Sequence, residues 1–247
     1  MRKHVAMNTL SLIAATLGLI VLCAGGCTSP GDEIASQTSL TPPNDGKLHF
    51  LALGDSYTIG ESVPETDRWP VQLVAMLRDD GVEVGDPQII ARTGWTCEEL
   101  SAAIDDADPT GEWDLVSLLI GVNDQYRKYD IEQYESRFAA LLDKAIDFAG
   151  GDASGVIVVA IPDWGVTPFG EESGRAEETA EALDRYNAIN ARVAASRGVK
   201  YVDIAAVSRE AATRPELVAV DGLHPSGELY TEWAKLVLPK AKAVLAR

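Results

Sequence analysis

Apolar residues along the chain fall into short continuous runs that alternate with longer amphipathic stretches. A short apolar run such as 115–120 is typical of a strand buried on both faces, whereas apolar residues three or four positions apart indicate a helix. Trp69, Leu73 and Leu77 have the helical spacing, and Gly81 ends that stretch. The pattern predicts strands at 48–53, 88–91, 115–120, 155–162 and 200–204, and helices at 67–80, 96–107, 131–148, 176–197, 215–219 and 226–245.

This alternation of strands and helices predicts an α/β fold with a five-stranded parallel sheet covered by helices on both faces. In such a sheet the carboxyl ends of the strands share one edge, and ligands bind outside that edge. Ser56 follows the first predicted strand, Gly94 the second, Asn123 the third and Asp163–Trp164 the fourth. We therefore expect these residues to lie near one another. A long loop is expected at 163–175, and its position at the same edge makes it the expected determinant of specificity.

The first 26 residues have the pattern of an export signal. Basic residues at 2–4 precede an apolar segment, 10–22, whose length of about 13 residues is short of the ~20 that cross a bilayer. Small residues then lead to Cys27, as in bacterial lipoprotein signals, in which the cysteine is acylated. Ala24 stands where those signals usually carry leucine, so ordinary cleavage before Cys27 remains the alternative. We expect an exported protein, anchored to a membrane through Cys27 or else periplasmic or secreted.

Residues 27–47 are poor in large apolar side chains and rich in Ser, Thr, Pro, Gly and Asp, which predicts a flexible tether. The folded domain is accordingly expected at 48–247. Cleavage before Cys27 would remove Cys23, and acylation of Cys27 would leave Cys97 without a disulfide partner. We expect Cys97 to be a small buried apolar residue.

Composition and net charge say little about the fold, but they limit the classes of partner that the protein can bind. The 247 residues are 46% hydrophobic and carry a net charge of −17. A chain of this length and hydrophobicity has enough apolar material for one sizeable domain. So acidic a surface repels phosphate backbones, which argues against a nucleic-acid partner. Nothing in the sequence has the spacing of a metal-ligand cluster, and we expect neither a metal nor a cofactor. Nothing in it indicates the oligomeric state.

Ser56 has two interpretations when only its neighbours are considered. In "LGDSYTIG" it can be a hydroxylated turn residue, or a nucleophile exposed at the end of a strand. A nucleophilic serine needs a base. Of the three histidines, His4 lies in the export signal and His49 begins the first strand, which leaves His224. Asp221, three positions earlier in "VDGLHPSGE", can orient that imidazole. The alternative for this pair is a surface turn and a helix cap.

Taken in order, four short motifs resemble the four conserved blocks of the SGNH (GDSL) hydrolase family over 48–245. They are Gly-Asp-Ser after the first strand, Gly94 after the second, Gly-x-Asn-Asp at 121–124, and Asp-x-x-His before the last helix. The resemblance implies a flavodoxin-like three-layer α/β/α sandwich. It also implies Ser56 as nucleophile, His224 as base, Asp221 as orienting acid, and an oxyanion hole formed by the Ser56 N–H, the Gly94 N–H and the Asn123 amide. No G-x-S-x-G motif of ordinary α/β-hydrolases occurs.

The activity implied by this resemblance is hydrolysis of a carboxylic ester through an acyl-enzyme. Lysophospholipids, acyl thioesters and acetylated carbohydrates are alternative substrates, and an envelope binding domain without turnover is an alternative of another class. Tyr57, Trp95, Tyr126 and Trp164 lie next to the implied site residues. They are expected either to line a substrate pocket or to pack in the core.

Overall fold

The computed structural model describes residues 40–246. The predicted export signal, 1–26, and the predicted anchor at Cys27 lie outside the described residues, as does the predicted tether up to residue 39. In the described remainder of the tether, Leu40 packs against the hydrophobic core. The carbonyl of Leu40 also accepts a hydrogen bond from the Thr110 N–H at 2.9 Å. Contacts with the domain therefore begin upstream of the first strand.

A parallel sheet lies at the centre of the described part of the chain. Its five strands within 40–246 are β1 (Phe50–Gly54), β2 (Gln88–Ala91), β3 (Leu115–Leu119), β4 (Val156–Val159) and β5 (Lys200–Val202), in the order β2-β1-β3-β4-β5. Every residue of β1, β3 and β4 is buried, as their continuous apolar runs predicted. The predicted five-stranded parallel sheet is confirmed.

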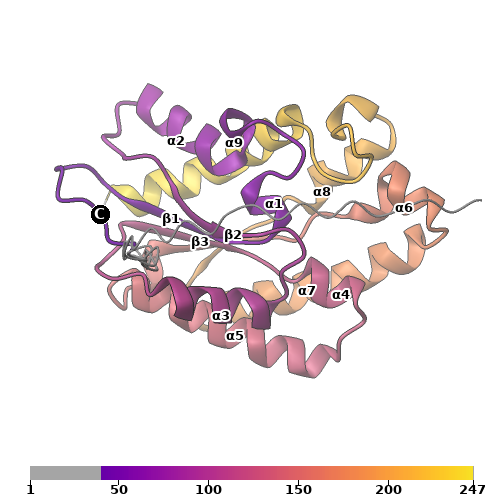
Figure 1. The fold of residues 1–247 in the computed structure, drawn as a ribbon, viewed down its shortest axis with the longest axis horizontal. Coiled ribbons are helices and arrows are strands. Elements are labelled where there is room, and N and C mark those ends of the chain that lie inside the picture. The colour runs from indigo at the N-terminus through magenta and orange to yellow at the C-terminus, as the bar shows by residue number, and fades with distance from the viewer. Residues whose placement is uncertain (1–39, 247) are drawn as a thin grey trace, which may run out of the picture. The chain divides into compact units, whose positions relative to one another are not determined.

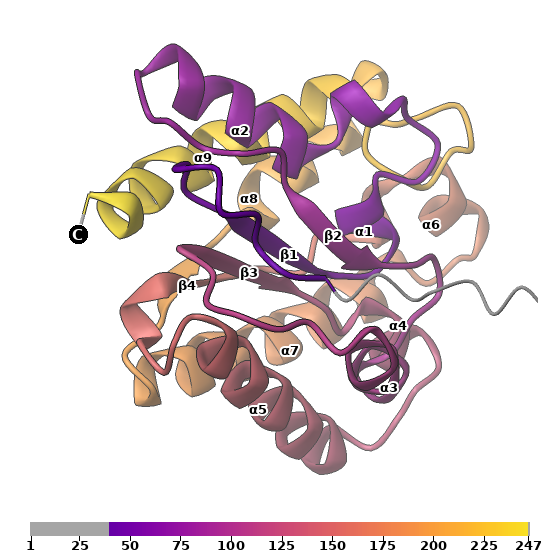
Figure 2. The ribbon, with the colours of Figure 1, turned by 60° about the vertical axis from the view of Figure 1, so that its left-hand side comes forward.

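Helices cover both faces of the sheet. Figures 1 and 2 show α2 (Trp69–Asp79) and α9 (Gly227–Leu245) on one face, and α3 (Cys97–Ala107), α5 (Ile131–Phe148) and α7 (Ala176–Ser196) on the other. This confirms the three-layer α/β/α arrangement. Within 40–246, no helix has the length and apolar character needed to cross a membrane.

Capping residues fix where the longer helices begin. The Thr96 side chain accepts from the Glu99 N–H while the Glu99 carboxylate accepts from the Thr96 N–H, a reciprocal capping box at the start of α3. Asp130 caps α5 and Ser226 caps α9 through their side-chain oxygens. Each of these helices starts within one residue of its predicted position.

Two of the predicted elements differ from the structure. The expected loop at 163–175 contains a 3-10 turn, η3 (Trp164–Val166), and a short helix, α6 (Pro168–Glu172). Proline suits the first position of a helix, and the Thr167 hydroxyl accepts from the Gly170 N–H at 3.2 Å, so this segment folds locally. The helix expected at 215–219 is only a 3-10 turn, η5 (Pro215–Leu217).

Besides α6, three other short helices within 40–246 were not predicted: α1 (Ser56–Ile59), α4 (Val122–Tyr126) and α8 (Ala205–Ser208). From β1 the chain passes to β2 on one side, while β3 pairs with the other side of β1. The carboxyl ends of β1 and β3 therefore flank the switch point where such sheets bind ligands. α1 follows β1 there and α4 follows β3, and Figure 1 shows both at the same end of the sheet as α6.

Gly54, the last residue of β1, leaves room for the chain to turn next to the end of β3. A Cβ at position 54 would lie 2.6 Å from the Leu119 carbonyl oxygen and would clash with the Thr58 side chain. A glycine at this position therefore lets the chain turn from β1 directly into α1.

Candidate active site

Ser56 is the first residue of α1, directly after the end of β1. Asp55 caps this helix because its Oδ1 accepts from the Tyr57 N–H at 3.0 Å. The cap fixes the direction in which the chain leaves the sheet. Ser56 is 4% exposed, and the surface it retains faces a cavity.

This cavity has a volume of about 220 Å³ and lies at the carboxyl edge of the sheet. Its lining is mostly apolar and includes no Asp, Glu, Lys or Arg side chain. The lining residues are Ser56, Tyr57, Val122, Asn123, Tyr126, Trp164, Phe169, Leu223 and His224. Six residues singled out in the sequence, which belong to segments far apart along the chain, thus meet around one space.

Asp221 and His224 form a close pair beside the cavity. The His224 Nδ1 lies 2.6 Å from Asp221 Oδ2, and Asp221 Oδ1 accepts from the Leu223 and His224 N–H groups at 2.9 and 3.0 Å. Burial raises the pKa of Asp221. The hydrogen bonds from the His224 ring, the Ser62 hydroxyl and the two backbone N–H groups outweigh burial and hold that pKa below its ordinary value. Asp221 is therefore a carboxylate at neutral pH, and His224 Nε2 is the ring nitrogen left for other chemistry.

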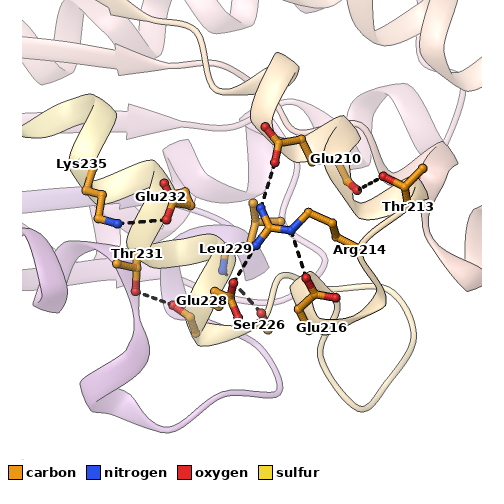
Figure 3. Close-up of polar contacts among 11 residues, drawn as sticks. Glu210, Thr213, Arg214, Glu216, Ser226, Glu228, Leu229, Thr231, Glu232 and Lys235 are labelled. Atoms are coloured by element: carbon orange, nitrogen blue, oxygen red, sulfur yellow. Dashed lines mark hydrogen bonds and ion pairs between the residues drawn. The ribbon is translucent and has the colours of Figure 1, made fainter.

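The loop that carries this pair, 218–225, closes on itself. Val218 and Pro225 form an antiparallel bridge, and the Ala219 N–H donates to the His224 carbonyl at 2.7 Å. At the base of the loop, Arg214 donates to three carboxylates at once, as Figure 3 shows. They belong to Glu210 before the loop, Glu216 in η5 and Glu228 in α9, at 2.9, 3.0 and 2.7 Å. One guanidinium thus links the segments on both sides of the loop.

The implied oxyanion donors differ in their relation to the cavity. Asn123, in α4, lines it, and one hydrogen of its Nδ2 is donated to the Trp95 carbonyl at 2.9 Å. Because a side-chain amide has two donor hydrogens, the second remains. Gly94 has a left-handed φ of 87°, and its carbonyl accepts from Arg127 Nη2 at 2.6 Å. Neither Gly94 nor Trp95 is among the residues that line the cavity.

An aromatic wall closes one side of the cavity. We give this name to Tyr126, Trp164 and Phe169, whose ring centroids lie 5.5 to 6.4 Å apart. Trp164 is 2% exposed and donates its Nε1–H to Gln125 Oε1 at 3.0 Å, whereas Tyr126 and Phe169 are 47% and 38% exposed. Trp164 is therefore the fixed base of the wall, and the other two rings form its solvent-facing rim.

Two buried carboxyl groups lie next to the site residues. Burial, together with the neighbouring charge of Asp124, raises the pKa of Asp55 to about 8. Burial also raises the pKa of Asp124, whose Oδ2 accepts from the Cys97 N–H at 3.0 Å. Cys97 is itself fully buried in the core, as predicted. Among residues 40–246, no group of three or more His, Cys, Asp and Glu side chains is arranged to hold a metal ion.

Sequence reasoning missed four residues that belong to this region. Val122 and Leu223 line the cavity because they adjoin Asn123 and His224, and Phe169 lies within the segment already expected to determine specificity. The fourth is Ser62, whose hydroxyl donates to Asp221 Oδ2 at 2.7 Å. No local pattern marks Ser62, because the contact joins positions 159 residues apart.

A comparison with protein families accounts for the arrangement of Ser56, Asn123, Asp221 and His224 around the cavity. The model of the GDSL-like lipase/acylhydrolase family matches residues 52–231. The chain belongs to this family. The matched residues include Ser56, Asn123, Asp221 and His224. Membership of this family makes the chain an esterase or acylhydrolase, an enzyme that acts on ester bonds.

Relatives of this GDSL-like acylhydrolase show the same fold. It is 24% identical to an acetylxylan esterase of Geobacillus stearothermophilus over 205 residues, which cover 79% of the chain and 84% of the relative. A crystal structure of the acetylxylan esterase Axe2 from that organism matches with a TM-score of 0.61 and 20% identity, over 78% of the chain and 94% of Axe2. The lipase/acylhydrolase of Enterococcus faecalis matches with the same TM-score and 20% identity, over 79% and 96%.

Proposed function

We propose that the protein hydrolyses carboxylic esters through an acyl-enzyme formed on Ser56. The main support for this proposal is that Ser56 and His224 line one cavity while the Asp221 carboxylate contacts His224 Nδ1. This contact leaves His224 Nε2 for proton transfer. A serine, an imidazole and an orienting carboxylate are the three groups that nucleophilic acyl transfer requires. Membership of an acylhydrolase family supports the same reaction.

In the proposed reaction Ser56 Oγ attacks the ester carbonyl carbon, and its proton passes to His224 Nε2. The tetrahedral intermediate collapses as the carbon–oxygen bond to the alcohol breaks, and the alcohol leaves with the proton from His224. A water molecule then attacks the acyl-enzyme, again giving its proton to His224, and the acid leaves as Ser56 regains its hydrogen. The Asp221 carboxylate stabilises the imidazolium that forms in both halves of the reaction.

We propose that three N–H donors stabilise the negative charge that develops on the carbonyl oxygen. They are the Ser56 backbone, the Gly94 backbone and the Asn123 side chain. The remaining amide hydrogen of Asn123 and its position on the cavity wall support its part in this set. The role of Gly94 rests on the family resemblance. Loss of one donor of this kind typically lowers the rate on the order of 10²- to 10³-fold.

We infer that the acyl group is short and uncharged. The cavity of about 220 Å³ is smaller than the ~300–1,000 Å³ of sites for drug-sized ligands, and its lining has no charged side chain to pair with an ionised substrate. An acetyl ester on a carbohydrate is the second candidate. The acetylxylan esterase relative and the exposed rings of Tyr126 and Phe169, on which a sugar could pack, favour it.

A panel of esters tests this function directly. Wild type and Ser56→Ala are assayed with p-nitrophenyl acetate, butyrate and decanoate, an acyl thioester and an acetylated xylo-oligosaccharide. We expect the highest kcat/KM for acetyl esters and a loss on the order of 10³-fold or more in Ser56→Ala. Ser136→Ala is the matched control, since the Ser136 hydroxyl donates only to the Glu132 carbonyl on the surface of α5. Undiminished turnover by Ser56→Ala would refute the proposal, and a preference for decanoate or the thioester would refute the substrate class.

A further inference from the structure

Asp221 receives four hydrogen bonds from the described residues, and three of them are local. Oδ1 accepts from the Leu223 and His224 N–H groups, and Oδ2 accepts from the His224 ring. All three donors lie within three residues of Asp221, so they fix the carboxylate within its own loop. They do not fix the loop relative to the nucleophile.

The fourth donor comes from a different part of the chain. Ser62 Oγ donates to Asp221 Oδ2 at 2.7 Å, the same oxygen that faces His224 Nδ1. Ser62 follows α1, and its segment is bonded back to that helix. The Gly60 and Glu61 N–H groups both donate to the Ser56 carbonyl. The residue directly before Ser62 is thus hydrogen-bonded to the nucleophile's own carbonyl, and Ser62 is hydrogen-bonded to the acid.

Ser62 has a left-handed backbone conformation, with φ at 66°. This region costs free energy for any residue with a Cβ and is the ordinary place for glycine. A strained residue at a functional site points to a side chain that is needed there. The hydrogen bond to Asp221 gives the Ser62 hydroxyl such a use.

We propose that Ser62 is a positioning residue that holds Asp221, and through it the His224 ring, in register with Ser56. This role rests on the proposed function, because it acts on the same acid and base. With a fourth donor, the carboxylate has a partner for each of its ~four lone-pair directions. Without Ser62, the Asp221–His224 pair and the edge contact of the His224 ring with Tyr57 of α1 would remain, but the loop would lose its hydrogen bond to the segment that follows α1.

Ser62→Gly separates this role from a structural one. Glycine removes the hydroxyl and at the same time relieves the left-handed strain, so we expect the melting temperature to stay level or to rise. We expect kcat for p-nitrophenyl acetate to fall on the order of tenfold, the effect of losing one hydrogen bond to a charged group. KM should change less than twofold, because Ser62 does not line the cavity. Ser62→Ala should lose a similar factor in kcat despite keeping the strain.

Asp108→Gly is the matched control. Asp108 is also a left-handed residue with a side chain, φ 42°, but it ends α3 and does not line the cavity. The Asp108→Gly variant should keep the wild-type kcat. If Ser62→Gly or Ser62→Ala keeps the wild-type kcat, or changes KM alone, the positioning role is wrong. Ser56→Ala, assayed beside them, distinguishes this failure from that of the proposed function, which would show as turnover without Ser56.

Discussion

Asp55 combines a local structural role with an unusual ionisation. As the N-cap of α1 it orients the helix that begins with Ser56, yet its side chain is fully buried and its Oδ2 has no hydrogen-bond partner among the described residues. Burial and the nearby charge of Asp124 therefore favour the protonated acid, with a pKa of about 8. An ordinary turn aspartate would have been ionised at neutral pH.

This raised pKa makes stability depend on pH. The folded protein holds the Asp55 proton more tightly than the unfolded chain, whose aspartate titrates near 3.8. The free energy of unfolding therefore falls as pH rises from about 4 to about 8. We expect Asp55→Asn, which keeps a good N-cap, to gain stability relative to wild type as pH increases. Melting temperatures measured from pH 5 to pH 9 would show the gain.

The control for this prediction is Asp130→Asn, the same substitution at the N-cap of α5, where the side chain is exposed. A difference in melting temperature between Asp55→Asn and wild type that stays constant with pH would contradict the account of Asp55.

At the scale of elements, the base of the loop at 218–225 depends on one guanidinium. Arg214 is surrounded by Glu210, Glu216 and Glu228, so its removal would leave three carboxylates facing one another as well as breaking their hydrogen bonds. A single exposed ion pair contributes little, but a network around one arginine fork holds its members in a defined geometry.

We expect Arg214→Gln to loosen the loop at 218–225 and to lower kcat for the acetyl ester several-fold. Hydrogen exchange read by mass spectrometry should be faster in peptides covering 218–225, and the difference should be largest at low salt, where the three carboxylates repel most strongly. Arg192→Gln is a suitable comparison, because it breaks a single exposed pair with Glu135 away from the loop. Unchanged exchange in 218–225 would show that Arg214 does not support the loop.

Helices and strands could be predicted from the sequence where the residues within the element itself determine its bounds. β2 and α5 have their predicted bounds, because an apolar run and a well-capped amphipathic stretch are local signals. α6 was missed since its five residues are too few for a periodic pattern, although Thr167 and Pro168 form a recognisable start. The helix predicted at 215–219 ends early because Val218 instead pairs with Pro225 across the loop.

At the scale of the whole molecule, the sequence predicted which residues meet but not the finer contacts. Their places after successive strands predicted that Ser56, Gly94, Asn123 and Trp164 lie near one another, and of these Ser56, Asn123 and Trp164 line the cavity. His224, chosen as the base from the histidines available and from the family resemblance, lines it too. Gly94 and Trp95 do not line it, because proximity to a strand end leaves the direction of each residue undetermined. The Ser62 contact was out of reach, since it depends on how two loops pack in three dimensions.

The site at which a fluorophosphonate labels the protein tests the role of Ser56 as nucleophile most directly. Attack by Ser56 Oγ on phosphorus displaces fluoride and leaves a stable phosphonate ester, which intact-mass measurement and peptide mapping locate. We expect a single adduct on the peptide that contains Ser56, and markedly slower labelling of His224→Ala. A folded protein that gains no adduct, or gains it on another residue while Ser56 stays unmodified, would contradict the assignment of Ser56 as the nucleophile.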